Sequence, residues 1–347
     1  TPSSSLLHFL AGLETRFGLT VVHPENEIAV ILMALGFAAA GKRAAVGTSG
    51  GGFCLMTEGL SLAGMAEIPV VILMSQRTGP STGLPTYTGQ ADLRFVLHAG
   101  QGEFPRLIVA PGDAAEAFVW SARAMDLAWR YQVPAIILTD KTLSEGTYSM
   151  DLPPADTPPG GTISAGNPAG DSGQYLRYAD SPGGVSPLAA AGTPGAVVKV
   201  NSYAHDEYGI TTEEAGMVDR MVQKRERKGV ALAEGLLHYS QVEVSGSRDA
   251  ATALLCWGST KGVCTETAGL LGLRVVRPVV LAPFPAAQLK TAFSGVSRCI
   301  AVEENASAQL AGLARGESIL VHDTILRSDG RPFTPEDLVV RIREVLS

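Results

Sequence analysis

Apolar residues form two kinds of pattern in the first 150 residues of the chain. Short apolar runs predict strands, and the run at 69–74 is apolar throughout, as in a strand that is covered on both faces. Stretches in which apolar residues recur every three or four positions predict helices. Strands are expected at 19–23, 44–48, 69–74, 106–110 and 134–139, and helices near 4–13, 28–40, 55–62 and 114–130. These repeated strand–helix–strand units favour a parallel sheet with helices on both faces.

The pattern changes after residue 150. Segment 151–196 holds eight prolines and nine glycines with little apolar periodicity, which is typical of an extended connector. A charged helix is expected at 212–228, and its basic residues, including Lys224 and Lys228, are more typical of a solvated face than of a binding patch. Strand and helix patterns then return. The strands are expected at 252–259, 273–280, 299–304 and 318–321, and a last helix begins with the pattern Thr334-Pro335.

The fold class that follows is α/β, with two doubly wound parallel-sheet domains. The first is expected at 1–150 and the second at 250–347, with the connector and the charged helix at 151–249 between them. A length of 347 residues suits two domains. The content of 46% hydrophobic and 18% charged residues is that of a globular protein.

Charge and cysteine spacing narrow the range of partners. The net charge of −7, without a long basic run, argues against nucleic acid as the main partner. The longest apolar stretch, 28–41, is too short to span a bilayer, and no signal-peptide pattern is visible, so we expect no membrane partner and a cytosolic protein. The four cysteines lack CxxC spacing, which argues against a metal site on this chain and favours free, buried thiols.

Candidate chemistry lies where strands end and helices begin, which is where open α/β sheets bind ligands. Glu25 and Glu27 could simply complement a helix dipole. The glycine-rich Ser49-Gly50-Gly51-Gly52 could be a tight turn or a phosphate cradle, although it matches neither dinucleotide nor Walker patterns. Arg77 could be a surface arginine or a clamp on a carboxylate, and the nearby Gly, Ser and Thr residues favour the clamp.

Taken in order, the motifs of the chain resemble those of the alpha subunits of 2-oxoacid:ferredoxin oxidoreductases, especially the 2-oxoglutarate group. The matching stretches are Thr1-Pro2-Ser3-Ser4, Glu25-Asn26-Glu27-Ile28-Ala29, 48–59, 66–71, 76–86, Gln90-Ala91-Asp92-Leu93 and 330–336. One departure is Gly51, where the family usually has proline; this changes the stiffness of the loop but removes no functional group. The family's first motif begins upstream of Thr1, so the native chain is expected to be longer.

The resemblance implies that 1–150 is the pyrimidine-binding half of a thiamine diphosphate site. A separate beta subunit would supply the diphosphate-binding half with Mg²⁺ and would carry a [4Fe-4S] cluster, in an alpha2-beta2 assembly. The Gly-Asp-Gly…Asn pattern of that other half is missing from this chain. The second domain would resemble the transketolase C-terminal type and would mainly serve subunit association.

The resemblance also implies residue roles. Glu27 would hydrogen-bond the pyrimidine N1′ and activate the cofactor, Thr48, Ser49 and Gly50 would line it, Arg77 would hold the substrate 1-carboxylate, and Thr1 would hydrogen-bond the substrate. The implied reaction converts 2-oxoglutarate and coenzyme A to succinyl-CoA and CO₂, with electrons passing to ferredoxin, or runs in reverse. A subunit acting on pyruvate or branched-chain 2-oxoacids and a non-catalytic scaffold subunit are the alternatives.

Overall fold

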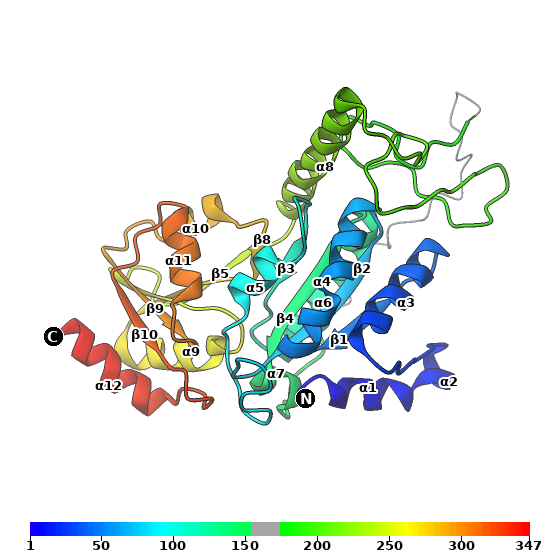
Figure 1. The fold of residues 1–347 in the computed structure, drawn as a ribbon. Coiled ribbons are helices and arrows are strands. Elements are labelled where there is room, and N and C mark those ends of the chain that lie inside the picture. Colours follow the sequence, from blue (N-terminus) through cyan, green and yellow to red (C-terminus); the bar gives the residue numbers. More distant parts are fainter. Residues whose placement is uncertain (154–173) are drawn as a thin grey trace.

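The computed structural model describes residues 1–153 and 174–347 and contains two sheets with helices packed around them (Figure 1). Part of the predicted connector, 154–173, lies outside the described residues. The first sheet has the strand order β1-β2-β4-β3-β8 and is parallel except for β8, which runs antiparallel to β3. Its strands are β1 (Ala45–Thr48), β2 (Val70–Gln76), β3 (Leu107–Val109), β4 (Pro134–Asp140) and β8 (Val280–Ala282).

The second sheet has the order β10-β9-β6-β7-β5 and is parallel except for β5. Its strands are β5 (Val242–Gly246), β6 (Thr252–Leu255), β7 (Arg274–Pro278), β9 (Arg298–Glu303) and β10 (Asp323–Leu326). The prediction of two parallel α/β sheets is confirmed. The boundaries at 150 and 250 stay predictions: β5 lies within 151–249 but joins the second sheet, and β8 lies beyond 250 but joins the first.

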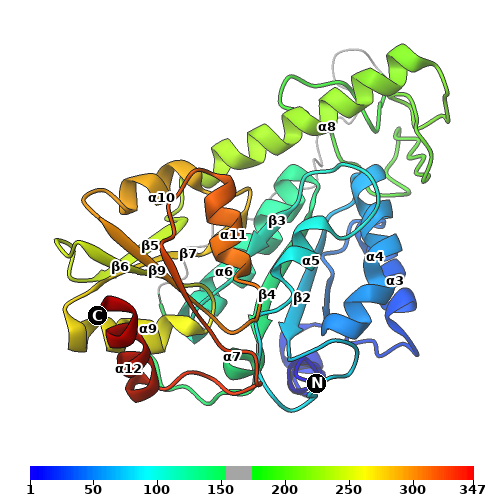
Figure 2. The same cartoon turned by 60° about the vertical axis from the view of Figure 1, so that its left-hand side comes forward.

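Helices cover both faces of the first sheet, with α3, α4 and α5 on one face and α6 and α8 on the other. The helices of this half are α1 (Ser4–Ala11), α2 (Glu14–Phe17), α3 (Glu27–Ala39), α4 (Gly50–Met65), α5 (Leu93–His98), α6 (Ala114–Tyr131), α7 (Lys141–Glu145) and α8 (Ala215–Leu236). The second sheet is accompanied by α9 (Thr260–Leu271), α10 (Ala286–Ala292), α11 (Gln309–Gly316) and α12 (Pro335–Leu346). In the turned view α5 and α11 lie side by side, so helices of the two halves also touch (Figure 2).

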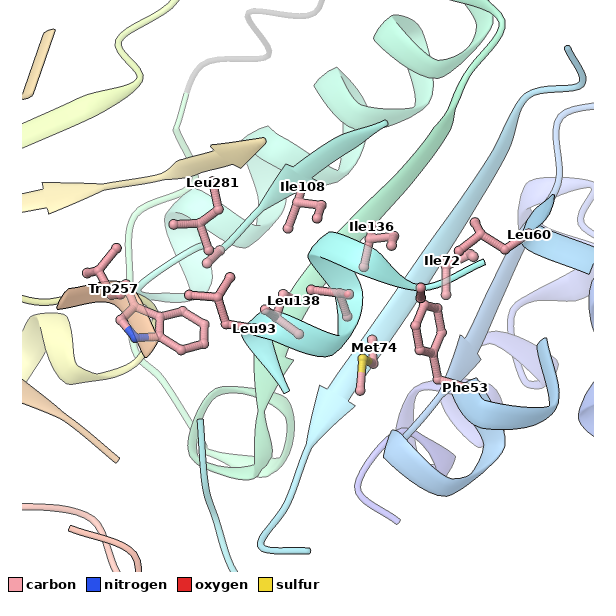
Figure 3. Packing of buried hydrophobic residues seen from close by; sticks show 14 of the residues in the cluster. Phe53, Leu60, Ile72, Met74, Leu93, Ile108, Ile136, Leu138, Trp257 and Leu281 are labelled. Atoms are coloured by element: carbon pink, nitrogen blue, oxygen red, sulfur yellow. The ribbon is translucent and has the colours of Figure 1, made fainter. Parts of the chain in front are cut away.

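Alternation along the strands sorts their side chains into two cores. Ile72 and Ile136 face a core shared with α3 and α4, whereas Val71 and Ile137 face a core shared with α6 and α8. The first of these cores continues without a break to Trp257 of the second half (Figure 3). The two sheets are therefore bound together by packed apolar side chains, and also by the chain itself, because β8 of the first sheet follows β7 of the second sheet after one residue.

Two of the expected strands are wrong. Segment 19–23 forms no strand, because most of its side chains are exposed and the backbone N–H of Val21 donates to Glu14 Oε1 at 2.6 Å instead of to a neighbouring strand. The strand expected at 318–321 lies at β10 instead, because Ser318 adopts a left-handed backbone conformation with φ of 61°. The proposed helix start at Thr334-Pro335 is confirmed, since Thr334 Oγ1 accepts a hydrogen bond from Asp337 N.

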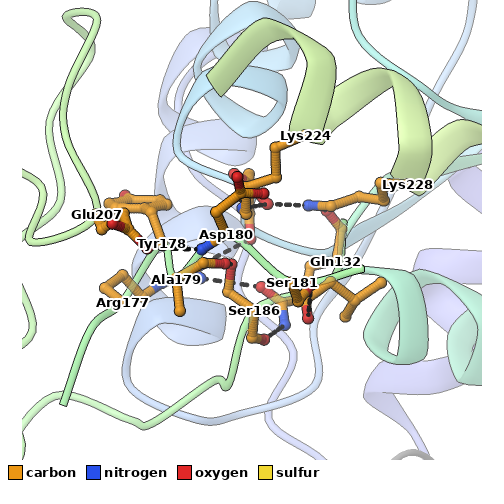
Figure 4. A network of polar contacts seen from close by, with 12 residues as sticks. Gln132, Arg177, Tyr178, Ala179, Asp180, Ser181, Ser186, Glu207, Lys224 and Lys228 are labelled. Atoms are coloured by element: carbon orange, nitrogen blue, oxygen red, sulfur yellow. Dashed lines mark hydrogen bonds and ion pairs between the residues drawn. The ribbon is translucent and has the colours of Figure 1, made fainter. Parts of the chain in front are cut away.

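The charged helix α8 also departs from its expected solvated character. Lys224 and Lys228, which Figure 4 labels, are fully buried. Both bind the carboxylate of Glu67. Although burial alone would raise the pKa of Glu67, these two lysines and Arg177 hold it well below its usual range. Arg177 Nη2 donates to the carbonyl of Glu67 at 2.7 Å, and Arg177 Nη1 donates to Gln132 Oε1 at 2.9 Å. This network fixes α8 and the segment after residue 174 onto the first domain.

Two further features bear on the sequence expectations. Within the described parts of the chain, no helix has the length and apolarity that crossing a membrane requires. All four cysteines are free, but only Cys256, Cys264 and Cys299 are buried, whereas Cys54 is exposed, contrary to the expectation of buried thiols.

Candidate active site

The predicted site residues lie along the carboxyl edge of the first sheet. Strand β1 ends at Thr48, β2 ends at Gln76 next to Arg77, and β4 ends at Asp140. Gln76 pairs with Asp140 in the register of the parallel strands, so their ends lie at one edge. This is the edge at which open α/β sheets bind ligands.

Glu27 opens helix α3, but it does not cap the helix. Asn26 is the N-cap, and its Oδ1 accepts a hydrogen bond from Ala29 N at 3.0 Å. The half-buried side chain of Glu27 instead reaches α4, where a Cβ atom at residue 52 would lie 2.5 Å from Glu27 Oε1. Glu25, the other acid of the motif, is exposed. The structure thus separates two acids that the sequence could not distinguish.

Gly52 brings Glu27 and Thr48 together. Thr48 is buried, and a Cβ atom at residue 52 would lie only 2.2 Å from its Oγ1. Any side chain at this position would therefore displace the carboxylate or the hydroxyl. The three glycines form the first turn of α4, because Ser49 is the N-cap and Gly50 begins the helix. They are therefore not the separate tight turn that was one of the two possibilities left open by the sequence.

The first turn of α4 follows Thr48 directly and lies beside the Glu27 carboxylate. Ser49 makes no side-chain capping bond, and the hydroxyl of Thr48 donates to the carbonyl of Ser49 at 3.2 Å. The amides at the start of a helix are donors without intrahelical partners and carry a partial positive charge. Thr48, Ser49 and Gly50 thus form, with the Glu27 carboxylate, a polar cluster that we name the cradle.

Arg77 and Thr1 form a second group. Arg77 Nη1 donates to the backbone carbonyl of Thr1 at 3.0 Å, so the N-terminal segment lies against the end of β2. The Nε atom of Arg77 is buried and, among the described residues, has no hydrogen-bond partner. A buried donor without a partner is costly, and a bound carboxylate would satisfy it.

Asp92 lies beside the cradle and was assigned no role from the sequence. Its carboxyl oxygen Oδ2 would lie 3.3 Å from a Cβ atom at residue 50, and its backbone N–H donates to Gln76 Oε1 at 3.0 Å. Burial raises the pKa of Asp92 to about 6. Gly52 was likewise missed as a determinant of the site. The sequence features that could have indicated these two residues are the place of Gly52 in the glycine run and the place of Asp92 in the motif Gln90-Ala91-Asp92-Leu93.

The chain is similar to several known proteins. The family described as pyruvate flavodoxin/ferredoxin oxidoreductase, thiamine diphosphate-binding, matches residues 1–224. The alpha subunit of 2-oxoacid:ferredoxin oxidoreductase 2 from Aeropyrum pernix is 37% identical, over 95% of this chain and 52% of the relative. The 2-oxoglutarate oxidoreductase subunit KorA from Mycobacterium tuberculosis is 31% identical, over 100% of this chain and 53% of the relative.

A solved structure is similar over the whole chain. The 2-oxoglutarate:ferredoxin oxidoreductase from Magnetococcus marinus, with 2-oxoglutarate, coenzyme A and succinyl-CoA bound, superimposes with a TM-score of 0.86 at 30% identity, covering 100% of this chain and 61% of that one. The fold is thus that of a thiamine diphosphate-binding domain. The chain belongs to the pyruvate flavodoxin/ferredoxin oxidoreductase family. It is similar to the alpha subunits of 2-oxoacid:ferredoxin oxidoreductases. It spans about half the length of these curated relatives.

Proposed function

We propose that this chain is the part of an alpha subunit that activates thiamine diphosphate for the oxidative decarboxylation of 2-oxoglutarate. Coenzyme A would accept the succinyl group, and ferredoxin would take the electrons. The observation that carries the proposal is the meeting of Glu27 and Thr48 over Gly52. The Glu27 carboxylate thus lies beside the amides at the start of α4, at the carboxyl edge of the first sheet. Both belong to the part of the chain that matches the thiamine diphosphate-binding family.

The residues present fit that cofactor. A flat heteroaromatic ring needs close approach to the backbone, which the glycines of α4 allow, and a hydrogen-bond partner for a ring nitrogen, which Glu27 supplies. When bound, thiamine diphosphate supplies the electron sink for decarboxylation. This chain would have two roles: to hold a proton between the Glu27 carboxylate and the pyrimidine N1′, and to orient the ring against Thr48, Ser49 and Gly50.

Arg77 and Thr1 are proposed to bind the substrate. The buried Nε of Arg77 supplies a charged donor for the 1-carboxylate of a 2-oxoacid, and Thr1 lies within contact of the same guanidinium. The preference for 2-oxoglutarate rests on two similar proteins, because the Mycobacterium tuberculosis protein is a 2-oxoglutarate oxidoreductase subunit and the Magnetococcus marinus enzyme has 2-oxoglutarate bound. Oxidative decarboxylation and reductive carboxylation would use the same residues.

A beta subunit is proposed as the partner that completes the site. It would bring the diphosphate-binding half with Mg²⁺ and a [4Fe-4S] cluster, in an alpha2-beta2 assembly. An apolar stripe beside Glu27 supports a partner on this side, since four large side chains of α3 are exposed: Ile28 (46%), Leu32 (45%), Met33 (39%) and Phe37 (42%). A group of large apolar side chains on one exposed helix face is typical of an interaction surface.

Reconstitution tests the proposal. The alpha chain would be combined with its beta subunit, and reduction of a viologen dye would be followed with coenzyme A and a panel of 2-oxoacids. We expect the highest kcat/KM with 2-oxoglutarate. If pyruvate or a branched-chain 2-oxoacid gives the highest kcat/KM, that acid and not 2-oxoglutarate is the substrate. A complex that binds tightly but turns over none of these acids would support the scaffold role instead.

A further inference from the structure

We infer that the second domain is a positioning element for substrate binding, because a turn at Gly330 and a contact at Gln90 together hold the loop that carries Arg77. This inference rests on the proposed role of Arg77. The segment 77–89 is named here the Arg77 loop. It connects β2 to the segment before α5, and most of its middle part, 79–87, is exposed.

The Arg77 loop is closed at its neck by its own hydrogen bonds. Thr78 Oγ1 donates to the carbonyl of Thr88 at 2.6 Å, and Leu84 N donates to the carbonyl of Thr78 at 2.9 Å. Thr78 follows Arg77 directly and takes part in both bonds. A displacement of the neck therefore displaces the backbone from which the Arg77 side chain extends.

The second domain bonds to the far side of this neck. Thr88 N donates to the carbonyl of Gly330 at 3.0 Å. Two residues further on, the fully buried Gln90 donates from its backbone N–H to the carbonyl of Glu304 at 2.7 Å and from Nε2 to the carbonyl of Trp257 at 2.8 Å. Asn305 Nδ2 donates to the carbonyl of Gln90 at 3.1 Å. The loop thus ends on groups of the second sheet.

Gly330 also lies so close to the loop that it leaves no room for a side chain. Its φ is 85°, and a Cβ atom at this position would lie 2.8 Å from Tyr87 Cβ, 3.0 Å from Leu84 Cδ1 and 3.2 Å from Thr78 Oγ1. Arg331, the next residue, lies over the ring of Tyr87 at 5.9 Å. This contact gives a reason for the motif Gly330-Arg331-Pro332-Phe333, which lies far from Glu27 in the sequence and had no role beyond resemblance.

The first domain holds the other end. Gln76 Nε2 donates to the carbonyl of Thr139 at 3.1 Å, and Gln76 Oε1 accepts from Asp92 N. Arg77 therefore lies between one residue fixed by the first sheet and a neck fixed by the second domain. Gly330 and Gln90 are positioning residues that act through Arg77, and loosening their contacts should weaken 2-oxoacid binding while the Glu27 cradle, on β1, α3 and α4, stays intact.

The test compares Gly330→Ala with Gly295→Ala in the reconstituted alpha–beta complex. Gly295 also has positive φ (78°) and lies in the second domain, but a Cβ atom there would meet nothing within 4 Å, so it reproduces the backbone strain without the loop contact. We expect Gly330→Ala to raise KM for 2-oxoglutarate about tenfold, the scale of a misplaced binding group, with thiamine diphosphate affinity unchanged. Gly295→Ala should change neither quantity.

The outcomes separate this inference from the proposed function. An unchanged KM in Gly330→Ala, while Arg77→Ala raises KM, would overturn the positioning role alone. If Arg77→Ala itself leaves KM unchanged, the proposed role of Arg77 fails first. Should Gly330→Ala not fold, Leu84→Ala tests the same contact from the loop, because Leu84 is 39% exposed and its removal leaves the core intact. A KM equal to that of the unmodified complex would then overturn the inference.

Discussion

Gln90 and Glu304 exchange two hydrogen bonds across the junction of the two sheets. Gln90 N donates to the carbonyl of Glu304 at 2.7 Å, and Glu304 N donates to Gln90 Oε1 at 3.0 Å. The Glu304 side chain is buried at the same junction, where its Oε1 accepts from Phe333 N at 3.3 Å. Burial, with a smaller contribution from the Asp140 carboxylate, raises the pKa of Glu304 to about 8.

This raised pKa predicts a pH-dependent stability. Between pH 4.5, the ordinary pKa of the group, and about pH 8, folded Glu304 keeps a proton that the unfolded chain releases. The free energy of unfolding should therefore fall as pH rises through this window, and Asp140, whose pKa burial also raises, contributes with the same sign. Glu304→Gln stays neutral, so its Tm should fall less between pH 5 and about pH 8 than that of the unmodified chain.

Thermal unfolding at several pH values measures the effect. The control is Glu317→Gln, because Glu317 is exposed, and this variant should follow the unmodified chain at every pH. Parallel Tm curves for Glu304→Gln and the unmodified chain would show that Glu304 is ionised in the folded protein.

The cradle predicts that Gly52→Ala weakens the binding of thiamine diphosphate. The new methyl group would overlap Thr48 Oγ1 and Glu27 Oε1, so one of the two must move. Gly51→Ala is the matched control, since it lies in the same helical turn and a Cβ atom there meets nothing within 4 Å. Calorimetric titration of cofactor into the reconstituted complex should show at least about tenfold weaker binding for Gly52→Ala alone. Equal affinities in both variants would remove the cradle from the cofactor site.

Arg77→Ala should weaken 2-oxoacid binding and leave cofactor binding intact. Loss of a charge-assisted hydrogen bond costs about 1.5–3 kcal/mol, which corresponds to a KM higher by roughly tenfold to a hundredfold. Arg77→Lys keeps the charge but loses the planar arrangement of donors, so its KM should lie between that of the unmodified complex and that of Arg77→Ala. The control is Arg343→Ala, an exposed arginine of α12. Cofactor affinity that falls while KM stays constant would indicate a different role for Arg77.

The Glu67 network predicts a large loss of stability in Glu67→Gln. Removing this carboxylate leaves the buried Lys224, Lys228 and Arg177 without their counter-charge, and breaking a buried ion pair costs about 3–5 kcal/mol. Asp180→Asn breaks the exposed pair with Arg227 instead and should cost less than about 1 kcal/mol. Urea unfolding measures the free energy of unfolding of both variants. A similar small decrease in both would show that the Glu67 network contributes little to stability.

The sequence predicted most of the fold because strand and helix periodicities are local. It failed where tertiary contacts decide. Segment 19–23 has the composition of a strand but has no neighbouring strand to pair with. Lys224 and Lys228 have the spacing of a solvated helix face, but they are buried and bind Glu67, which lies about 160 residues away in the chain. Strand β8 could not be foreseen either, because its partner β3 lies in the other half of the chain.

The candidate site was predictable through its ordered motifs but not through its geometry. No local pattern distinguishes Glu27 from Glu25; the distinction comes from Asn26, which caps the helix, and from Gly52, which admits the Glu27 carboxylate. The support that Gly330 gives to the Arg77 loop joins segments more than 200 residues apart, so periodicity and spacing could not reveal it.

The most direct test of the account is the turnover of Glu27→Gln against Glu25→Gln in the reconstituted alpha–beta complex with 2-oxoglutarate and coenzyme A. Both variants remove one negative charge from the same motif, but only Glu27 reaches the cradle. The account predicts a kcat lower by at least ~10²-fold for Glu27→Gln, the scale of a lost acid–base contribution, and nearly normal kcat for Glu25→Gln. Nearly normal turnover of Glu27→Gln would contradict the central claim.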